Sequence, residues 1–232
     1  MKKVVLSLSG GMDSTALLGF ILGQGKEIGL EEVHVCNFQY GSKHNRYEAR
    51  AFLNVVKYYR DFGFHIVPYE FDLSAVFQPF KSNLLLSGGD IPEGHYEAES
   101  MKATVVPGRN TIFASIMLGL AESVGAGIIT LGVHAGDHHI YPDCRDTYIT
   151  SLDKTIREAS DHKVSVIAPL LKMNKTDILS LGYIQDPPAP FSLTRTCYKD
   201  QELSCGKCGS CQERLEAFAE IKITDPIKYE TI

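Results

Sequence analysis

The 232-residue sequence has no tryptophan, no low-complexity tract and no long apolar run. A membrane-spanning helix needs about 20 consecutive apolar residues, so we expect no membrane segment. Lys2 and Lys3 precede apolar residues, as in a secretion signal. The glycine pair at 10–11 and Asp13 interrupt that apolar stretch, however, so we expect a cytoplasmic protein.

The sequence also lacks a basic excess, since 23 lysines and arginines against 28 aspartates and glutamates give a formal net charge of −5. Proteins that bind nucleic acid or anionic lipid through charge concentrate positive residues. We therefore expect no direct nucleic-acid binding and favour a small-molecule substrate. With 44% hydrophobic and 22% charged residues, the chain is typical of a globular protein with one main core and room for a small appendage.

A loop suited to anion binding lies near the start of the chain. An apolar run over residues 4–8 stops at a glycine pair, and a helical pattern begins near Asp13. Glycines let backbone N–H groups approach a ligand, and a helix N-terminus offers unpaired N–H groups and a positive dipole end. The Walker A and dinucleotide-binding patterns both fail here. Residues 9–15, SGGMDST, instead resemble the pyrophosphate-binding loop of the N-type ATP pyrophosphatases.

Asp13 in this loop has two readings. At a nucleotide site it would hold Mg²⁺, which prefers oxygen ligands such as carboxylates and phosphates. The alternative is an ordinary glycine turn in which Asp13 caps the following helix.

Strand and helix patterns alternate along most of the chain. Strands are predicted over 4–8, 33–38, 65–69, 128–132 and 164–167, and helices over 46–62, 111–124, 147–159 and 174–181. Such alternation predicts right-handed βαβ units on a parallel sheet. We therefore expect an α/β fold, a doubly wound open parallel sheet, over residues 1–186.

Residues 74–104 interrupt the alternation with scattered prolines, glycines and charges. Loops of this length are commonly functional, so we expect a mobile flap over the substrate, with a plain surface insertion as an equal alternative. Arg109 follows, just before an apolar helix. An arginine there suits bidentate contacts to phosphate or carboxylate, or is simply solvated.

The loop over residues 132–145 follows a predicted buried strand. Ligands bind outside the carboxyl ends of parallel strands, so this loop is a second site candidate. No helix is predicted there to bring its histidines, among them His134 and His138, onto one face at i, i+4, which favours a polar substrate-binding loop over a metal site. Cys144 is a candidate thiol nucleophile, whereas Cys36 is expected in the core.

Four of the six cysteines cluster near the end of the chain, at Cys197, Cys205, Cys208 and Cys211. Thiolates at this spacing can ligate one tetrahedral ion, and a full Cys₄ sphere favours structural zinc, with an iron–sulfur cluster as the rival. The stretch PPAP at 187–190 is typical of a linker. We therefore expect residues 187–232 to form a proline linker, a zinc module and a C-terminal helix over 212–221, packed on the same core.

Taken together, these segments resemble the 7-cyano-7-deazaguanine synthases over nearly the whole chain. The matching motifs are SGGMDST at 9–15, YG at 40–41 with His44, PGRN at 107–110, YPDCR at 141–145, TCY at 196–198 and CGKCGSC at 205–211. Two departures are Ser42, where the family usually has glutamine, and the proline stretch at 187–190, where a shorter segment is expected. The resemblance implies the adenine nucleotide alpha hydrolase-like (HUP) fold.

The resemblance implies a ligase that forms carbon–nitrogen bonds. It would convert 7-carboxy-7-deazaguanine, ammonia and ATP, with Mg²⁺, into the nitrile 7-cyano-7-deazaguanine (preQ0), a precursor of queuosine, through an adenylated carboxylate and an adenylated amide. Adenylation supplies a leaving group that neither a carboxylate nor an amide has by itself. We expect a homodimer, the common default for soluble oligomers.

The resemblance also implies roles for individual residues. Asp13 and Ser14 would hold pyrophosphate and Mg²⁺, and Arg109 would offset charge on the transferred phosphate. Asp137, Asp143 and Arg145 would orient the deazaguanine or its carboxylate. The expected nucleotide-binding residues are Leu8, Ser9, Gly10, Gly11, Met12, Asp13, Ser14, Thr15, Ala16, Leu17 and Leu18.

Three alternatives stay open at this point. A relative that conjugates deazaguanine would use the same adenylation but pass the acyl group to a protein amine. A tRNA thiolase would pass it to sulfur, but it would want reactive cysteines near the loop. A non-catalytic module that binds nucleic acid through its cysteine cluster is of a different class, and the acidic net charge argues against it.

Overall fold

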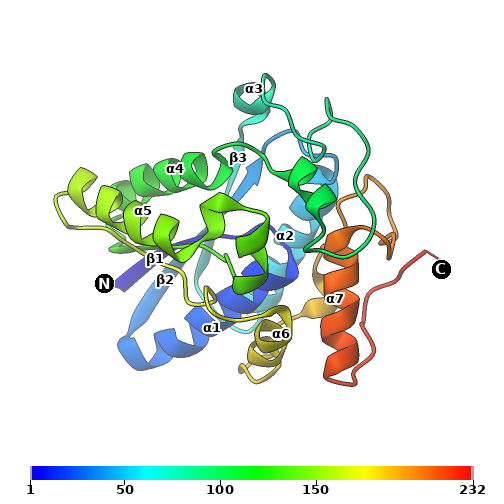
Figure 1. Cartoon of the computed structure of the whole chain (residues 1–232). Helices are drawn as coiled ribbons and strands as arrows, with labels where there is room; N and C mark the ends of the chain where they lie inside the picture. The colour runs from blue at the N-terminus through cyan, green and yellow to red at the C-terminus, as the bar shows by residue number, and fades with distance from the viewer. Residues whose placement is uncertain (1, 231–232) are drawn as a thin grey trace.

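The computed structural model describes residues 2–230 and contains one five-stranded, all-parallel sheet with the strand order β3-β2-β1-β4-β5 (Figure 1). The strands are β1 (Lys2–Ser7), β2 (Leu30–Gln39), β3 (Ile66–Asp72), β4 (Ile128–Thr130) and β5 (Ser165–Ile167). Val5 is in register with His34 on one side and Ile129 on the other. The predicted open parallel sheet is therefore confirmed.

Seven helices connect and flank the strands in the described residues. They are α1 (Met12–Ile28), α2 (Asn45–Asp61), α3 (Ser74–Phe77), α4 (Arg109–Val124), α5 (Asp146–Ala159), α6 (Lys175–Tyr183) and α7 (Gly209–Glu220). Two bounds differ from the sequence prediction in ways that matter. Arg109 is the first residue of α4 and does not precede it, and α7 begins at Gly209, so that Cys211 lies in its first turn.

The alternation of side chains along the central strand divides the core into two layers. Val5 faces α4 and α5, where it packs with residues such as Phe113. Val4 and Leu6 face the opposite side, where α1, α2, α6 and α7 contribute residues such as Phe52. Figure 1 shows α4 and α5 above the sheet and α1 and α6 below it. Both faces of the sheet are covered, as parallel strands require.

The site-forming edge of the sheet is set by the strand order. The chain moves outward from β1 to β2 and β3, and then crosses back to β4 and β5 on the other side of β1. The loops that leave β1 and β4 therefore diverge at their carboxyl ends. A crevice at such a switch point is the usual ligand site in an open α/β sheet.

Two segments outside the regular pattern pack against this framework. Residues 74–104 contain α3 and a short 3₁₀ helix at Glu99–Thr104, and they bury Phe77, Leu84 and Met101 in the α4 layer. In the proline-rich segment, Ala189 and Phe191 are buried in the α1 layer. Within the described residues, no helix combines the length and apolarity that crossing a bilayer requires.

Candidate active site

The loop between β1 and α1 is shaped to present backbone N–H groups. Gly10 has a φ of +86°, and a Cβ there would lie 2.6 Å from the backbone N of Phe52 and 2.8 Å from the carbonyl O of Glu48, so only glycine fits. α1 then begins at Met12, and Gly11 stands at its N-cap without a side-chain cap. The first-turn N–H groups therefore have no partner within the helix and suit an anionic ligand. The reading of Asp13 as a helix cap is wrong.

Asp13 instead belongs to a buried charge cluster. Lys175 Nζ donates to both of its carboxylate oxygens, and it also lies 3.1 Å from Glu213 Oε2 and 3.1 Å from His134 Nε2. Burial acts to raise the pKa of Asp13, but the charge and hydrogen bond of Lys175, together with His134 and Arg214, outweigh it and the net shift is downward. Burial acts to lower the pKa of Lys175, and the two carboxylates raise it above its usual range. The cluster therefore keeps Asp13 ionised and Lys175 charged.

Arg109 presents a charge with no carboxylate within ion-pair distance among the described residues. Its Nη1 donates to the Tyr40 hydroxyl at 3.4 Å, and its guanidinium lies over the Tyr40 and Tyr141 rings at 5.8 and 5.9 Å. The side chain lines the same cavity as the loop at 9–14. A cation held by aromatic rings and free of an acidic partner is well suited to an incoming phosphate or carboxylate.

The three residues expected to orient the substrate lie in different places. Asp137 lines the cavity, where its Oδ1 accepts a hydrogen bond from the Tyr96 hydroxyl at 2.7 Å. Asp143 lies behind the cavity wall and accepts from the backbone N–H of Asn110 at 3.1 Å. Arg145 is exposed and donates through Nε to the His138 carbonyl at 3.0 Å. The structure therefore brings Asp137 to the site but not Arg145.

Only part of the expected nucleotide-binding segment lies on the cavity wall. Its residues on the cavity wall are Ser9, Gly11, Met12, Asp13 and Ser14. The side chains of Leu8, Ala16, Leu17 and Leu18 are fully buried in the core layer beneath, and Thr15 is also buried. These core side chains support the loop and do not reach the cavity.

Aromatic residues and two cysteines form another part of the wall. Phe38 and Phe113 stack with ring centroids 4.1 Å apart, and Tyr96, Tyr141 and Tyr198 line the cavity beside them. Burial raises the pKa of the Cys36 thiol to about 12 and that of Cys144 well above its usual value. Both cysteines line the cavity as neutral thiols, so neither is an activated nucleophile.

Sequence reasoning missed Lys175, Glu213 and the tyrosines of the cavity wall. Lys175 lies within an Asn174–Asp177 capping box, which is present as predicted and which accounts for the local motif without a functional role. Tyr40, Tyr141 and Tyr198 did belong to the recognised motifs. Their positions within these motifs were the signal in the sequence that could have identified them as site residues.

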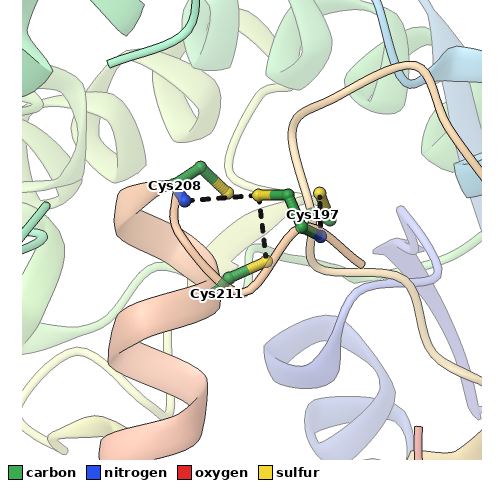
Figure 2. Close-up of side chains that lie close together, drawn as sticks. Cys197, Cys208 and Cys211 are labelled. Atoms are coloured by element: carbon green, nitrogen blue, oxygen red, sulfur yellow. Dashed lines mark hydrogen bonds between the residues drawn. The ribbon is translucent and has the colours of Figure 1, made fainter. Parts of the chain in front are cut away.

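The four clustered cysteines form a site that fits a single metal ion (Figure 2). All four side chains are buried and their Sγ atoms lie within 4.8 Å of one another. A tetrahedral zinc site with Zn–S bonds of about 2.3 Å separates its sulfurs by about 3.8 Å, and the Sγ atoms of Cys205 and Cys211 are 4.0 Å apart. Backbone N–H groups of Lys207 and Cys208 donate to Cys205 Sγ, which favours a thiolate. An iron–sulfur cluster would spread the sulfurs farther apart.

The cysteine cluster lies directly behind the cavity. Thr196 and Tyr198 flank Cys197, and both line the cavity. Ser210 and Glu213, on either side of Cys211, line it as well. A metal held by the cysteines would therefore order one wall of the site.

The sequence was compared with protein-family models and with known proteins. Residues 3–222 match the family model described as "Queuosine biosynthesis protein QueC". A 7-cyano-7-deazaguanine synthase of Pseudoalteromonas atlantica is 40% identical over 233 residues, which cover 99% of this chain and all of the relative. The 7-cyano-7-deazaguanine synthase 1 of Colwellia psychrerythraea is 43% identical over 229 residues, which cover 99% of each chain.

The U34-tRNA thiolase NcsA from Methanococcus maripaludis, solved with its [4Fe-4S] cluster, aligns with a TM-score of 0.44 and 16% sequence identity. The alignment covers 78% of this chain and 55% of that one.

Proposed function

This chain belongs to the QueC family of queuosine biosynthesis proteins, and we propose that it converts 7-carboxy-7-deazaguanine, ammonia and ATP into 7-cyano-7-deazaguanine. It is a ligase, as its relatives named 7-cyano-7-deazaguanine synthase are. The observation that carries the proposal is one cavity that joins a loop suited to anions to an aromatic recess, whose Arg109 forms no ion pair within residues 2–230. The two halves suit a nucleotide phosphate and a flat heterocyclic carboxylate.

The phosphate half would activate the substrate. The first-turn N–H groups of α1, the hydroxyls of Ser9 and Ser14 and the Lys175 ammonium would bind the triphosphate. The substrate carboxylate then attacks the α-phosphorus, and pyrophosphate leaves. Arg109 would offset the negative charge that builds up on the transferred phosphate. This route releases AMP and pyrophosphate.

Magnesium would join the triphosphate at this loop, where its charge would help to neutralise the leaving pyrophosphate. Asp13 is the carboxylate of the loop that could contribute an oxygen ligand. Both of its oxygens are bonded to Lys175 in this structure. Each oxygen keeps a second lone pair, so Asp13 could bind the ion beside Lys175.

The aromatic half would hold the deazaguanine. Tyr96, Tyr141 and Tyr198 offer faces for stacking, and Asp137 offers a carboxylate to the N–H groups of a guanine-like ring. Asp143 would act from behind the cavity wall by anchoring the start of α4, since it accepts a hydrogen bond from the N–H of Asn110.

The metal at the four cysteines is proposed to be one structural zinc ion per chain, and a homodimer is the proposed assembly.

Mass spectrometry of products tests the proposal. Purified protein is incubated with ATP, Mg²⁺, ammonium and 7-carboxy-7-deazaguanine. The nitrile together with AMP is the expected result. AMP without amide or nitrile would move the acceptor to a protein amine, as in a conjugating relative. An absence of nucleotide turnover would overturn the proposal.

A further inference from the structure

His44 and Glu48 form a pair at the wall of the active-site cavity. His44 stands at the N-cap position of α2, directly after the loop that leaves β2, and Glu48 is one turn further on the same face. Their Nε2 and Oε2 atoms lie 3.3 Å apart, and the exposed fractions of the two side chains are 3% and 17%. Both residues line the cavity.

The pair lies beside the phosphate-binding loop. The carbonyl oxygen of Glu48 is one of the atoms that leave no room for a Cβ on Gly10. The His44 ring lies 5.5 Å from the ring of Tyr198, which lines the aromatic part of the cavity. The pair therefore sits between the place of the phosphates and the place of the heterocycle.

The second ring nitrogen of His44 is unused. Nδ1 is buried and has no hydrogen-bond partner among residues 2–230. A carboxylate beside Nε2 favours the tautomer that carries its proton there, which leaves a lone pair on Nδ1. A buried acceptor without a partner is costly unless a ligand or water satisfies it.

The carboxylates on the cavity wall other than Glu48 face other side chains. Asp13 and Glu213 face Lys175, and Asp137 accepts from the hydroxyl of Tyr96. The guanidinium of Arg195 donates to four backbone carbonyls. Among residues 2–230, His44 is the histidine on this wall, and its free basic nitrogen with a carboxylate behind it has the arrangement of a general base.

We propose that His44, oriented by Glu48, is the base that removes protons from the substrate nitrogen. This inference rests on the proposed function and deepens it. In the first condensation, the ammonia lone pair forms the C–N bond to the acyl carbon. The C–O bond to AMP breaks, AMP leaves with the electron pair, and a proton passes from nitrogen to Nδ1.

The nitrile step makes the same demand on the base. The amide nitrogen gives its first proton to Nδ1 as the amide oxygen takes up AMP and a neutral imidate forms. Nδ1 releases that proton to solvent, and it takes the second proton as the C–O bond breaks and the C≡N bond forms. AMP again leaves with the electron pair of the broken bond. One base beside the acyl carbon therefore serves both the condensation with ammonia and the elimination that forms the nitrile.

The decisive variant is His44→Gln, whose amide nitrogen can still donate to Glu48 but offers no basic lone pair. Substrate-dependent exchange of pyrophosphate into ATP reports adenylation, and mass spectrometry reports amide and nitrile. Exchange is expected to stay within about threefold of the unsubstituted protein, whereas amide formation falls by about 100-fold or more. Hydroxylamine, a free base near neutral pH, should restore acyl transfer in part as the hydroxamate.

Two further variants keep the outcome clear. His65→Gln is the matched control, because His65 is exposed and lies outside the cavity. If His44→Gln fails to fold, Glu48→Gln provides the test. Amide formation is again expected to fall much more than pyrophosphate exchange. Amide formation at the unsubstituted rate, or an equal loss of exchange and amide, would overturn the inference. Absence of exchange in the unsubstituted protein would instead mark failure of the proposed function.

Discussion

Lys175 Nζ donates hydrogen bonds to Asp13 Oδ1 at 2.8 Å and to Oδ2 at 2.7 Å. The aspartate lies in the first turn of α1, the lysine opens α6, and 162 positions separate them in the sequence. The packing of α6 against α1 brings a positive charge to the loop where phosphates are proposed to bind. The aspartate holds that charge in place until a ligand competes for it.

Replacing this lysine should weaken nucleotide use, and it should also lower the free energy of unfolding, because two carboxylates lose their buried partner. In Lys175→Gln, the negative charges of Asp13 and Glu213 remain while their shared cation is lost, so a triphosphate meets repulsion. We expect substrate-dependent pyrophosphate exchange to fall by about 100-fold or more. Lys57→Gln, which removes an exposed lysine paired with Asp61, is the control and should leave exchange unchanged. Equal exchange in both variants would contradict the assignment.

The Asp13 interaction should give a defined pH dependence of stability. The folded-state pKa of Asp13 lies below its ordinary value, so its contribution to the free energy of unfolding is complete above about pH 4. That contribution is lost as the pH falls through the lowered pKa. Urea unfolding of the unsubstituted protein and of Asp13→Asn should differ by a constant amount between neutral pH and about pH 5. The difference in the free energy of unfolding between the two proteins should then become smaller on further acidification. A difference that grows would contradict the lowered pKa of Asp13.

Removal of the metal should affect both stability and the active site. Chelation leaves four buried thiols without a common ligand, so we expect the melting temperature to fall by about 10 °C or more. Nucleotide affinity should fall as well, because Thr196, Tyr198 and Ser210 border both the cysteines and the cavity. Zinc should restore both properties, and elemental analysis should find one zinc per chain. Recovery of iron and sulfide instead would identify the rival cluster.

Arg214 should be among the most sensitive positions for folding. Its side chain is completely buried, and its guanidinium donates to both Asp225 oxygens, to Thr194, to Thr196 and to the Phe191 carbonyl. Arg214→Met would leave Asp225 buried without its partner, and we expect a loss of about 3–5 kcal/mol of unfolding free energy. Arg157→Met, which breaks an exposed pair with Asp153, should cost about 1 kcal/mol or less. Urea unfolding measures both.

The two cysteines of the cavity wall should resist alkylation. Burial disfavours the thiolates of Cys36 and Cys144, and the thiolate is the form that reacts. Intact mass spectrometry after iodoacetamide treatment near neutral pH should find both residues unmodified in the folded protein. The same protein in urea is the positive control. Rapid labelling of Cys144 in the folded protein would restore it as a candidate nucleophile.

The sequence by itself determined the sheet, the loop and the cysteine cluster. Each of these is local: hydrophobic periodicity reports which face of an element is buried, and residues 9–15 and 205–211 carry their chemistry within a few positions. The apolar runs were sufficient to predict strands to within a few residues. The Asn174–Asp177 box was also readable, because a helix cap is a local motif.

Only the tertiary structure decided which charged groups meet. The sequence predicted Lys175 only as part of a helix cap and Glu213 only as a helix residue. The packing of α6 and α7 brings both side chains to the neighbourhood of Asp13. Packing also placed Arg145 outside the cavity and left His44 Nδ1 without a hydrogen-bond partner in the described part of the chain. The physical reason is range: strand and helix patterns arise from near neighbours in the chain, whereas a charge cluster depends on where distant elements dock.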